Sequence, residues 1–133
     1  MPLTYLFDAS SLVRALKEAR LVPLGGQAIQ WLTVYEVLNA LWKEVYLLHK
    51  LSPKEAISIT SDFEELVRNM VVLEPSGLEQ EVLQIAVSKG VTAYDASYIA
   101  LAKRHGLVLV TEDKKLRKAA SGIVESISLD AIV

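Results

Sequence analysis

The sequence predicts an α/β fold, a three-layer α/β/α sandwich built around a mostly parallel central sheet. Two short and almost continuously apolar runs, residues 3–7 and 107–110, have the composition of strands that are buried on both faces. Longer segments with apolar residues at helical spacing lie between and around them. Strands and helices that alternate along one chain are typical of a parallel sheet covered by helices on both sides.

Local signals place the individual elements. Apolar residues recur at helical spacing over residues 32–49, which predicts a long and mostly covered helix. The run Ser52-Pro53-Lys54-Glu55 combines an N-cap, a first-turn proline and a capping-box glutamate, and Thr92 also suits an N-cap. Gly90 and Gly106 are in positions that favour helix ends. The expected elements are a strand over 3–7, a helix from Ser10 or Ser11 to about 19, a strand over 28–31, helices over 32–49 and 53–69, a strand over 70–73, helices over 75–89 and 93–105, a strand over 107–110, a helix over 114–120 and a strand over 124–127.

The length and composition limit the possible function classes. A chain of 133 residues fits one compact domain, which we expect to span residues 1–133. Apolar residues make up 52%, so we expect a partner or a second copy to cover part of the surface. With no cysteine and only two, widely separated histidines, any metal ion must be bound by oxygen atoms.

The charge and the apolar stretches carry further expectations. A net charge of -2 gives no overall attraction to nucleic acid, so RNA binding would need a local basic patch. The apolar stretches are too short or too interrupted to cross a bilayer, and the N-terminal residues show no export signal. We therefore expect a cytoplasmic protein without a membrane anchor.

Four acidic residues, Asp8, Glu36, Asp95 and Asp113, are the candidates for a functional site. Each also has a simple structural explanation: Asp8 and Asp113 could cap helices, Asp95 could complete a capping box, and Glu36 could lie on a solvated helix face. Taken together, two of them end apolar strands and two occupy helix positions that can face the same sheet edge. Carboxylates gathered in one pocket repel one another unless cations neutralise them, so the pattern predicts a site for Mg²⁺ or Mn²⁺.

The motifs around these acids resemble the PIN domain family, and within it the VapC-type toxins of toxin–antitoxin systems. The resemblance covers nearly the whole chain, and its four acids are 28, 59 and 18 residues apart. The matching blocks are Phe7-Asp8-Ala9-Ser10-Ser11-Leu12-Val13, Glu36-Val37-Leu38-Asn39-Ala40-Leu41, Thr92-Ala93-Tyr94-Asp95-Ala96-Ser97-Tyr98 and Leu109-Val110-Thr111-Glu112-Asp113.

The resemblance implies a metal-dependent endoribonuclease that hydrolyses RNA phosphodiesters with metal-activated water. It implies that the four acids bind the metal and are catalytic, supported by Ser10, Asn39 and Thr111. A homodimer is also implied, as is an antitoxin whose C-terminal segment lies over the acidic groove. Asn in place of Asp8 or Asp95 is expected to abolish cleavage and to leave the fold intact. The chain departs from the family pattern at Glu112, in place of a common Asn, and at Lys115, in place of a further Asp, so one bound ion is better supported than two.

Basic and aromatic residues near the motifs have two possible explanations. Lys114, Lys115, Arg117 and Lys118 follow Asp113 and are candidates for holding the RNA backbone, although a solvated helix surface explains them equally well. A set of four aromatic residues is better explained by core or interface packing than by base stacking. These aromatic residues are Trp31, Tyr35, Trp42 and Tyr46.

Several other functions remain as alternatives. Within the resembled family these are an RNA-maturation nuclease and a non-catalytic PIN-like binding module, although a silent module is expected to lack one or more of the acids. A phosphoacceptor signalling domain is disfavoured because Asp8 stands alone and no Asp follows residues 70–73. A nucleotide-binding enzyme is disfavoured because the sequence contains neither a dinucleotide fingerprint nor a P-loop.

Overall fold

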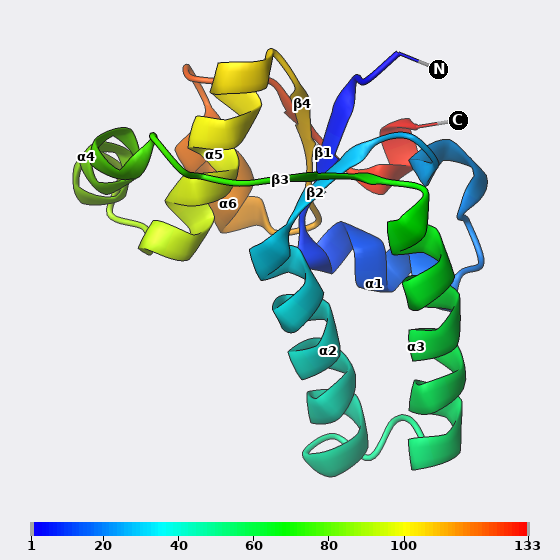
Figure 1. The fold of residues 1–133 in the computed structure, drawn as a ribbon. Coiled ribbons are helices and arrows are strands. Elements are labelled where there is room, and N and C mark those ends of the chain that lie inside the picture. The colour runs from blue at the N-terminus through cyan, green and yellow to red at the C-terminus, as the bar shows by residue number, and fades with distance from the viewer. Residues whose placement is uncertain (1, 133) are drawn as a thin grey trace.

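The fold is built on a five-stranded sheet in the order β3-β2-β1-β4-β5, in which every pair of neighbouring strands is parallel. The computed structural model describes residues 2–132 (Figure 1). Its elements are β1 (Tyr5–Phe7), α1 (Ala9–Lys17), the 3-10 turn η1 (Val22–Leu24), β2 (Ala28–Gln30), α2 (Trp31–Tyr46), α3 (Pro53–Arg68), β3 (Val71–Leu73), α4 (Glu79–Lys89), α5 (Ala93–His105), β4 (Val108–Val110), α6 (Lys114–Ala120), β5 (Ser126–Ile127) and the 3-10 turn η2 (Leu129–Ala131).

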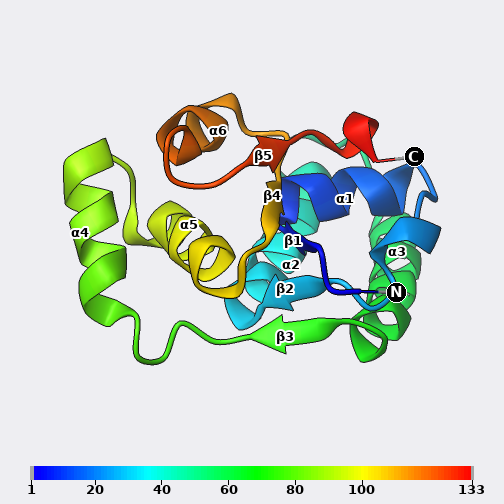
Figure 2. The ribbon, with the colours of Figure 1, turned by 90° about the horizontal axis from the view of Figure 1, so that it is seen from above.

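Helices cover both faces of this sheet, as the sequence predicted, because successive strand residues point to opposite sides (Figure 2). In β1, Leu6 packs with α4, α5 and α6, whereas Phe7 packs with α1, α2 and α3. Leu109 and Val110 divide in the same way in β4. The predicted three-layer α/β/α sandwich is therefore confirmed, with one apolar core on each side of the sheet.

The α2 and α3 helices run side by side away from the sheet, as Figure 1 shows. The expected capping box at the start of α3 is present, with Ser52 accepting from the backbone of Glu55 and the Glu55 side chain accepting from the backbone of Ser52. At the far end of α2, the buried carboxylate of Glu44 pairs with Lys17 of α1. The capping box stabilises the start of α3, and the ion pair joins the C-terminal part of α2 to α1.

Two expectations about helices need correction. The α4 helix begins at Glu79 rather than at residue 75, because Gly77 adopts a φ of 88°, which breaks the helical path. The α2 helix is not mostly covered: Trp31, Trp42 and the two tyrosines of this helix are exposed, so the proposed core packing of these aromatic residues is wrong. Packing at an interface remains a prediction for them.

No helix within residues 2–132 combines the length and the apolar character that a membrane span needs.

Candidate functional site

The site lies at the carboxyl ends of the two central strands. β1 and β4 are parallel neighbours with Phe7 opposite Val110, and the backbone N–H of Asp8 donates to the carbonyl of Val110 at 3.1 Å. From β1 the chain continues to β2 and β3 on one side, whereas β4 and β5 lie on the other side. The strand ends at such a change of direction are the usual ligand position in open α/β sheets. Asp8, which follows β1, and Thr111, which follows β4, both lie there.

Asp8 is the most enclosed of the four candidate acids, with only 5% of its surface exposed. It caps α1 by accepting from the backbone N–H of Ser11 at 2.9 Å, and Ser10 and Thr111 donate their hydroxyls to its carboxylate oxygens. Burial raises the pKa of Asp8 above its ordinary value, and these hydrogen bonds only partly offset the rise. The carboxylate is thus held in one orientation while its negative charge remains poorly compensated.

Glu36 is held by a chain of hydrogen bonds that reaches it through Tyr98, which is 1% exposed. The Tyr98 hydroxyl donates to Oε1 of Glu36 at 2.6 Å and lies 2.7 Å from the hydroxyl oxygen of Thr33. Because the Tyr98 hydrogen points to Glu36, Thr33 supplies the hydrogen in its contact with Tyr98, and it accepts from the backbone N–H of Gln30 at 3.2 Å. Every donor in this chain therefore points towards the carboxylate.

The surroundings of Glu36 disfavour its ionised form. Burial raises the pKa of Glu36, the charges of Asp8 and Asp95 raise it further, and the hydrogen bond from Tyr98 offsets only part of the rise. The pKa of Tyr98 is also raised, by burial and by the negative charge of Glu36, so its hydroxyl keeps its hydrogen and acts as a donor. Glu36 is therefore not an ordinary charge on a solvated helix face.

Asp95 lies in the first turn of α5, where only its backbone takes part in capping. Its N–H donates to the Thr92 hydroxyl at 3.1 Å, but its carboxylate accepts no hydrogen bond from the residues that the structure describes. Burial raises the pKa of Asp95, as do the charges of Asp113 and Asp8, while Lys115 opposes the rise. The reciprocal capping box is thus absent, and the carboxylate is left for another partner.

Asp113 is the N-cap of α6, where its Oδ1 accepts from the backbone N–H groups of Lys115 and Leu116 at 2.8 and 3.3 Å. Its own N–H donates to the Thr111 hydroxyl oxygen at 3.0 Å, and that hydroxyl in turn donates to Asp8. Thr111 thereby links the loops that carry the first and last acids. Asp113 combines the structural role that its sequence position allowed with a place beside Asp95.

The four acids, here called the acidic quartet, gather at one edge of the sheet: the Thr111 hydroxyl contacts both Asp8 and the backbone of Asp113, Asp8 and Asp95 act on the pKa of Glu36, and Asp113 acts on that of Asp95. Within residues 2–132, no three carboxylates or imidazoles already converge closely enough to hold one metal ion. The acidic quartet is thus a loose cluster of carboxylates rather than a formed coordination site. All of its possible metal ligands are carboxylate oxygens, and the pKa values of Asp8, Glu36 and Asp95 are raised. Both properties fit a hard divalent cation, whose charge would stabilise the ionised carboxylates.

The supporting polar residues expected from the sequence separate into two groups. Ser10 and Thr111 both hold Asp8, and the Ser10 hydroxyl also accepts from the backbone N–H of Glu112 at 2.9 Å. Asn39 is exposed and its side chain makes no hydrogen bond with any residue from 2 to 132. Only the two hydroxyl residues are therefore placed where they orient an acid.

Glu112 turns away from the acidic quartet and anchors the C-terminal segment instead. Its carboxylate accepts from the Ser128 hydroxyl at 2.9 Å, from the Leu129 N–H at 2.8 Å and from Arg14 at 2.6 Å. Burial acts to raise the pKa of Glu112, but these hydrogen bonds outweigh it and hold the pKa below the ordinary value. Glu112, which departs from the family pattern, thus has a structural role in holding the C-terminal segment.

Two functional contacts were missed by sequence reasoning, those of Tyr98 and of Arg14. Tyr98 stands three residues after Asp95, a spacing that puts both on one side of α5 and gave a signal that could have been used. Arg14 contacts Glu112 and Asp130, which are about a hundred residues away in sequence. No local pattern indicates that pairing.

An open parallel sheet covered by helices, with acidic side chains at the carboxyl ends of its strands, places this chain among the α/β proteins whose ligand sites lie at that edge. The family model described as PIN domain matches residues 3–122. The chain therefore belongs to the PIN domain family. Nucleases of this family generally use a divalent metal ion.

Two curated relatives are similar to this chain, both from Pyrobaculum aerophilum. Exonuclease VapC9 is 38% identical over 127 residues, which cover 94% of this chain and 92% of the relative. Ribonuclease VapC3 is 32% identical over 93 residues, which cover 70% of each chain. The sequence similarity thus extends to proteins with nuclease names.

Solved structures share the fold. PAE2754 from Pyrobaculum aerophilum has a TM-score of 0.79 and 34% identity, over 97% of this chain and 91% of that one. A DNA-bound VapBC structure from Salmonella typhimurium has a TM-score of 0.66 and 17% identity, over 96% and 98% of the two chains. At that identity the second similarity supports the fold alone.

Proposed function

We propose that this chain is a metal-dependent endoribonuclease and the toxin of a toxin–antitoxin pair. The observation that carries the proposal is the acidic quartet at one edge of the sheet, where burial raises the pKa of Asp8, Glu36 and Asp95 and the charges of neighbouring acids add to the rise at Glu36 and Asp95. The names of the relatives VapC9 and VapC3 support a nuclease. The four acids serve as the metal ligands and the catalytic residues.

The residues of the chain provide oriented ligands rather than a proton-transferring base. The two histidines, His49 and His105, lie at the ends of helical segments outside the quartet, and the chain has no cysteine. Mg²⁺ or Mn²⁺ bound at the quartet would supply Lewis-acid stabilisation of the phosphoryl oxygens and activation of water. Ser10, Ser11 and Thr111 hold Asp8, and Tyr98 holds Glu36, so hydrogen bonds fix the orientation of both carboxylates before an ion binds.

The test is cleavage of a labelled single-stranded RNA with Mn²⁺, Mg²⁺ or EDTA, comparing the wild type with Asp95→Asn and Glu36→Gln. We expect both variants to lose at least a hundredfold in rate, because each removes a ligand, while both remain folded by circular dichroism. Asp8→Asn is less suitable than the sequence implied, because its carboxylate also caps α1 and accepts from two hydroxyls. Full activity in both variants would refute the assignment.

A circular RNA distinguishes internal cleavage from trimming at an end, which matters because one relative is named an exonuclease. We expect the circle to be linearised at a rate close to that of internal cleavage of the linear RNA. An intact circle beside a shortened linear RNA would replace the endonuclease proposal with an exonuclease. The metal and the quartet would keep their roles in either case.

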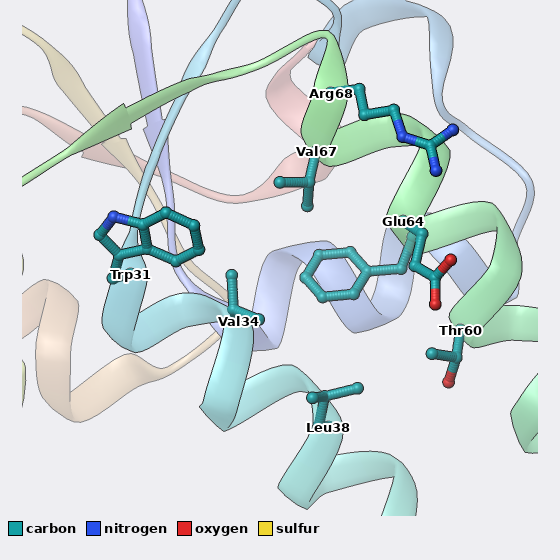
Figure 3. Close-up of a pocket in the computed structure, with 8 residues that line it drawn as sticks. Trp31, Val34, Leu38, Thr60, Glu64, Val67 and Arg68 are labelled. Atoms are coloured by element: carbon teal, nitrogen blue, oxygen red, sulfur yellow. The ribbon is translucent and has the colours of Figure 1, made fainter.

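An antitoxin is the proposed partner, supported by the VapBC complexes among the structural neighbours and by an apolar groove between α2 and α3 (Figure 3). The cavity has a volume of about 340 Å³. Figure 3 shows Trp31, Val34 and Leu38 of α2 on one side of it, with Val67 of α3 opposite. Co-expression with the protein encoded by the adjacent reading frame tests this, with Leu38→Glu expected to weaken the complex.

A homodimer is proposed on similar grounds, because α4 and the start of α5 also expose apolar side chains. Leu83, Val87 and Tyr94 are 62%, 76% and 63% exposed. Light scattering should give twice the chain mass of 14.7 kDa for the wild type. Leu83→Glu is expected to shift the mass towards that of the monomer.

A further inference from the structure

Three lysine side chains from two separate helices line one cavity beside the acidic quartet. The cavity has a volume of about 440 Å³ and lies where the C-terminal end of α4 meets α6. Figure 2 shows these two helices on the same side of the sheet, together with α5. We call this feature the lysine cavity, and its lining residues are Ser88, Lys89, Gly90, Val91, Lys115, Lys118 and Ala119.

The three lysines of the lysine cavity form no ion pair within residues 2–132. Lys17 and Lys103 form ion pairs with glutamates, but Lys89, Lys115 and Lys118 have no carboxylate within 4.0 Å among residues 2–132. The three ammonium groups therefore repel one another around a shared space. An anion in that space would supply the missing countercharge.

The position of Lys115 connects the lysine cavity to the acidic quartet. Lys115 lines the cavity, and its backbone N–H donates to Oδ1 of Asp113 at 2.8 Å. Lys118 lies three residues further along α6, on the same helix face. A nucleic-acid strand with one phosphate at the quartet would be repelled by the other carboxylates, whereas the lysine cavity offers positive charge to an adjacent phosphate.

We propose that the lysine cavity binds a backbone phosphate of the RNA strand, adjacent to the phosphodiester at the acidic quartet. The proposal rests on the proposed nuclease function and specifies the path of its substrate. Of the four basic residues of α6, only Lys115 and Lys118 line the cavity, so the proposal assigns phosphate binding to these two and not to Lys114 or Arg117. It also adds Lys89, which comes from α4 and lies outside that run.

Binding of a fluorescently labelled twelve-nucleotide RNA, measured by anisotropy in EDTA over a range of salt concentrations, tests the proposal. We expect Lys89→Gln and Lys118→Gln each to weaken binding about fivefold and to reduce the salt slope by about 0.7, the value for one lost phosphate contact to a single strand. Lys89→Arg keeps the charge and should retain binding. Lys54→Gln removes the same charge from the exposed start of α3 and should change the affinity less than twofold.

Cleavage of the same RNA with Mn²⁺ separates this proposal from the nuclease proposal. If the wild type cleaves and Lys89→Gln binds like Lys54→Gln, the lysine cavity proposal is overturned and the nuclease stands. If the wild type binds through Lys89 but does not cleave, the cavity is supported and the nuclease proposal fails. A wild type that neither binds nor cleaves overturns both. Melting temperatures check that the variants are folded.

Discussion

The hydroxyl of Tyr98 donates a hydrogen bond of 2.6 Å to Oε1 of Glu36, joining α5 to α2 beside the acidic quartet. The contact joins residues 62 positions apart, and its donor is buried while its acceptor is partly exposed. Thr33 and the backbone of Gln30 extend the chain behind Tyr98. The orientation of Glu36 therefore depends on the packing of α5 against α2.

Tyr98→Phe is expected to weaken Mn²⁺ binding about tenfold, because loss of a residue that orients a metal ligand typically has an effect of this size. It should also lower the free energy of unfolding by about 1 kcal/mol, since the Thr33 hydroxyl loses its acceptor. Titration calorimetry measures the affinity. Tyr94→Phe is the matched control, since Tyr94 lies on the same helix and its exposed hydroxyl makes no hydrogen bond with residues 2–132. Unchanged Mn²⁺ affinity in Tyr98→Phe would show that Tyr98 does not position Glu36.

Asp95→Asn is expected to stabilise the metal-free protein at neutral pH. The pKa of Asp95 is raised by burial and by the nearby Asp113 and Asp8, so the folded state binds its proton more readily than the unfolded state does. The resulting destabilisation is full above the folded pKa and disappears below the ordinary pKa of an aspartate. Melting in EDTA at pH 8 should show a gain of about 0.5 kcal/mol, a small value because solvent screens the partly exposed group. A gain that persisted unchanged at pH 3 would contradict this cause.

Divalent metal should reverse that order of stability. A ligand that binds only the folded state at a hundred times its dissociation constant adds about 2.7 kcal/mol, so Mn²⁺ should raise the melting temperature of the wild type by several degrees. Asp95→Asn should show a smaller rise because it lacks one ligand. Sodium chloride at matched ionic strength is the control for general screening. Equal rises in the two proteins would argue against a shared metal site.

Arg14→Gln is expected to lower the melting temperature by a few degrees at pH 7, because Arg14 contacts Glu112 and Asp130 and ties α1 to the C-terminal segment. The pKa of Glu112 is held low, so its contribution is present above its unfolded pKa and is lost as the pH falls through the folded value. The difference between the variant and the wild type should therefore narrow below about pH 4. Thermal melts at pH 7 and pH 3 measure this, and a constant difference would exclude the ion pair as the cause.

Much of the fold could be predicted because its signals are local. The capping box at Ser52 and Glu55, the N-cap at Thr92 and the left-handed glycines Gly90 and Gly106 each act within one helical turn. The α4 start was missed because Gly77 can adopt both helical and non-helical backbone angles. The exposure of the aromatic side of α2 was missed because periodicity identifies an apolar helix face but not what covers it.

The sequence by itself determined the elements, their alternation and the four acids that follow or face the strand ends. Only the tertiary structure decided how those acids are held, with Tyr98 donating to Glu36 and Thr111 linking Asp8 to Asp113. The tertiary structure turned Glu112 away from them towards Arg14. It also brought Lys89 beside Lys115. Local propensities act over a few residues, whereas these contacts depend on how helices pack on the sheet, which places residues far apart in sequence side by side.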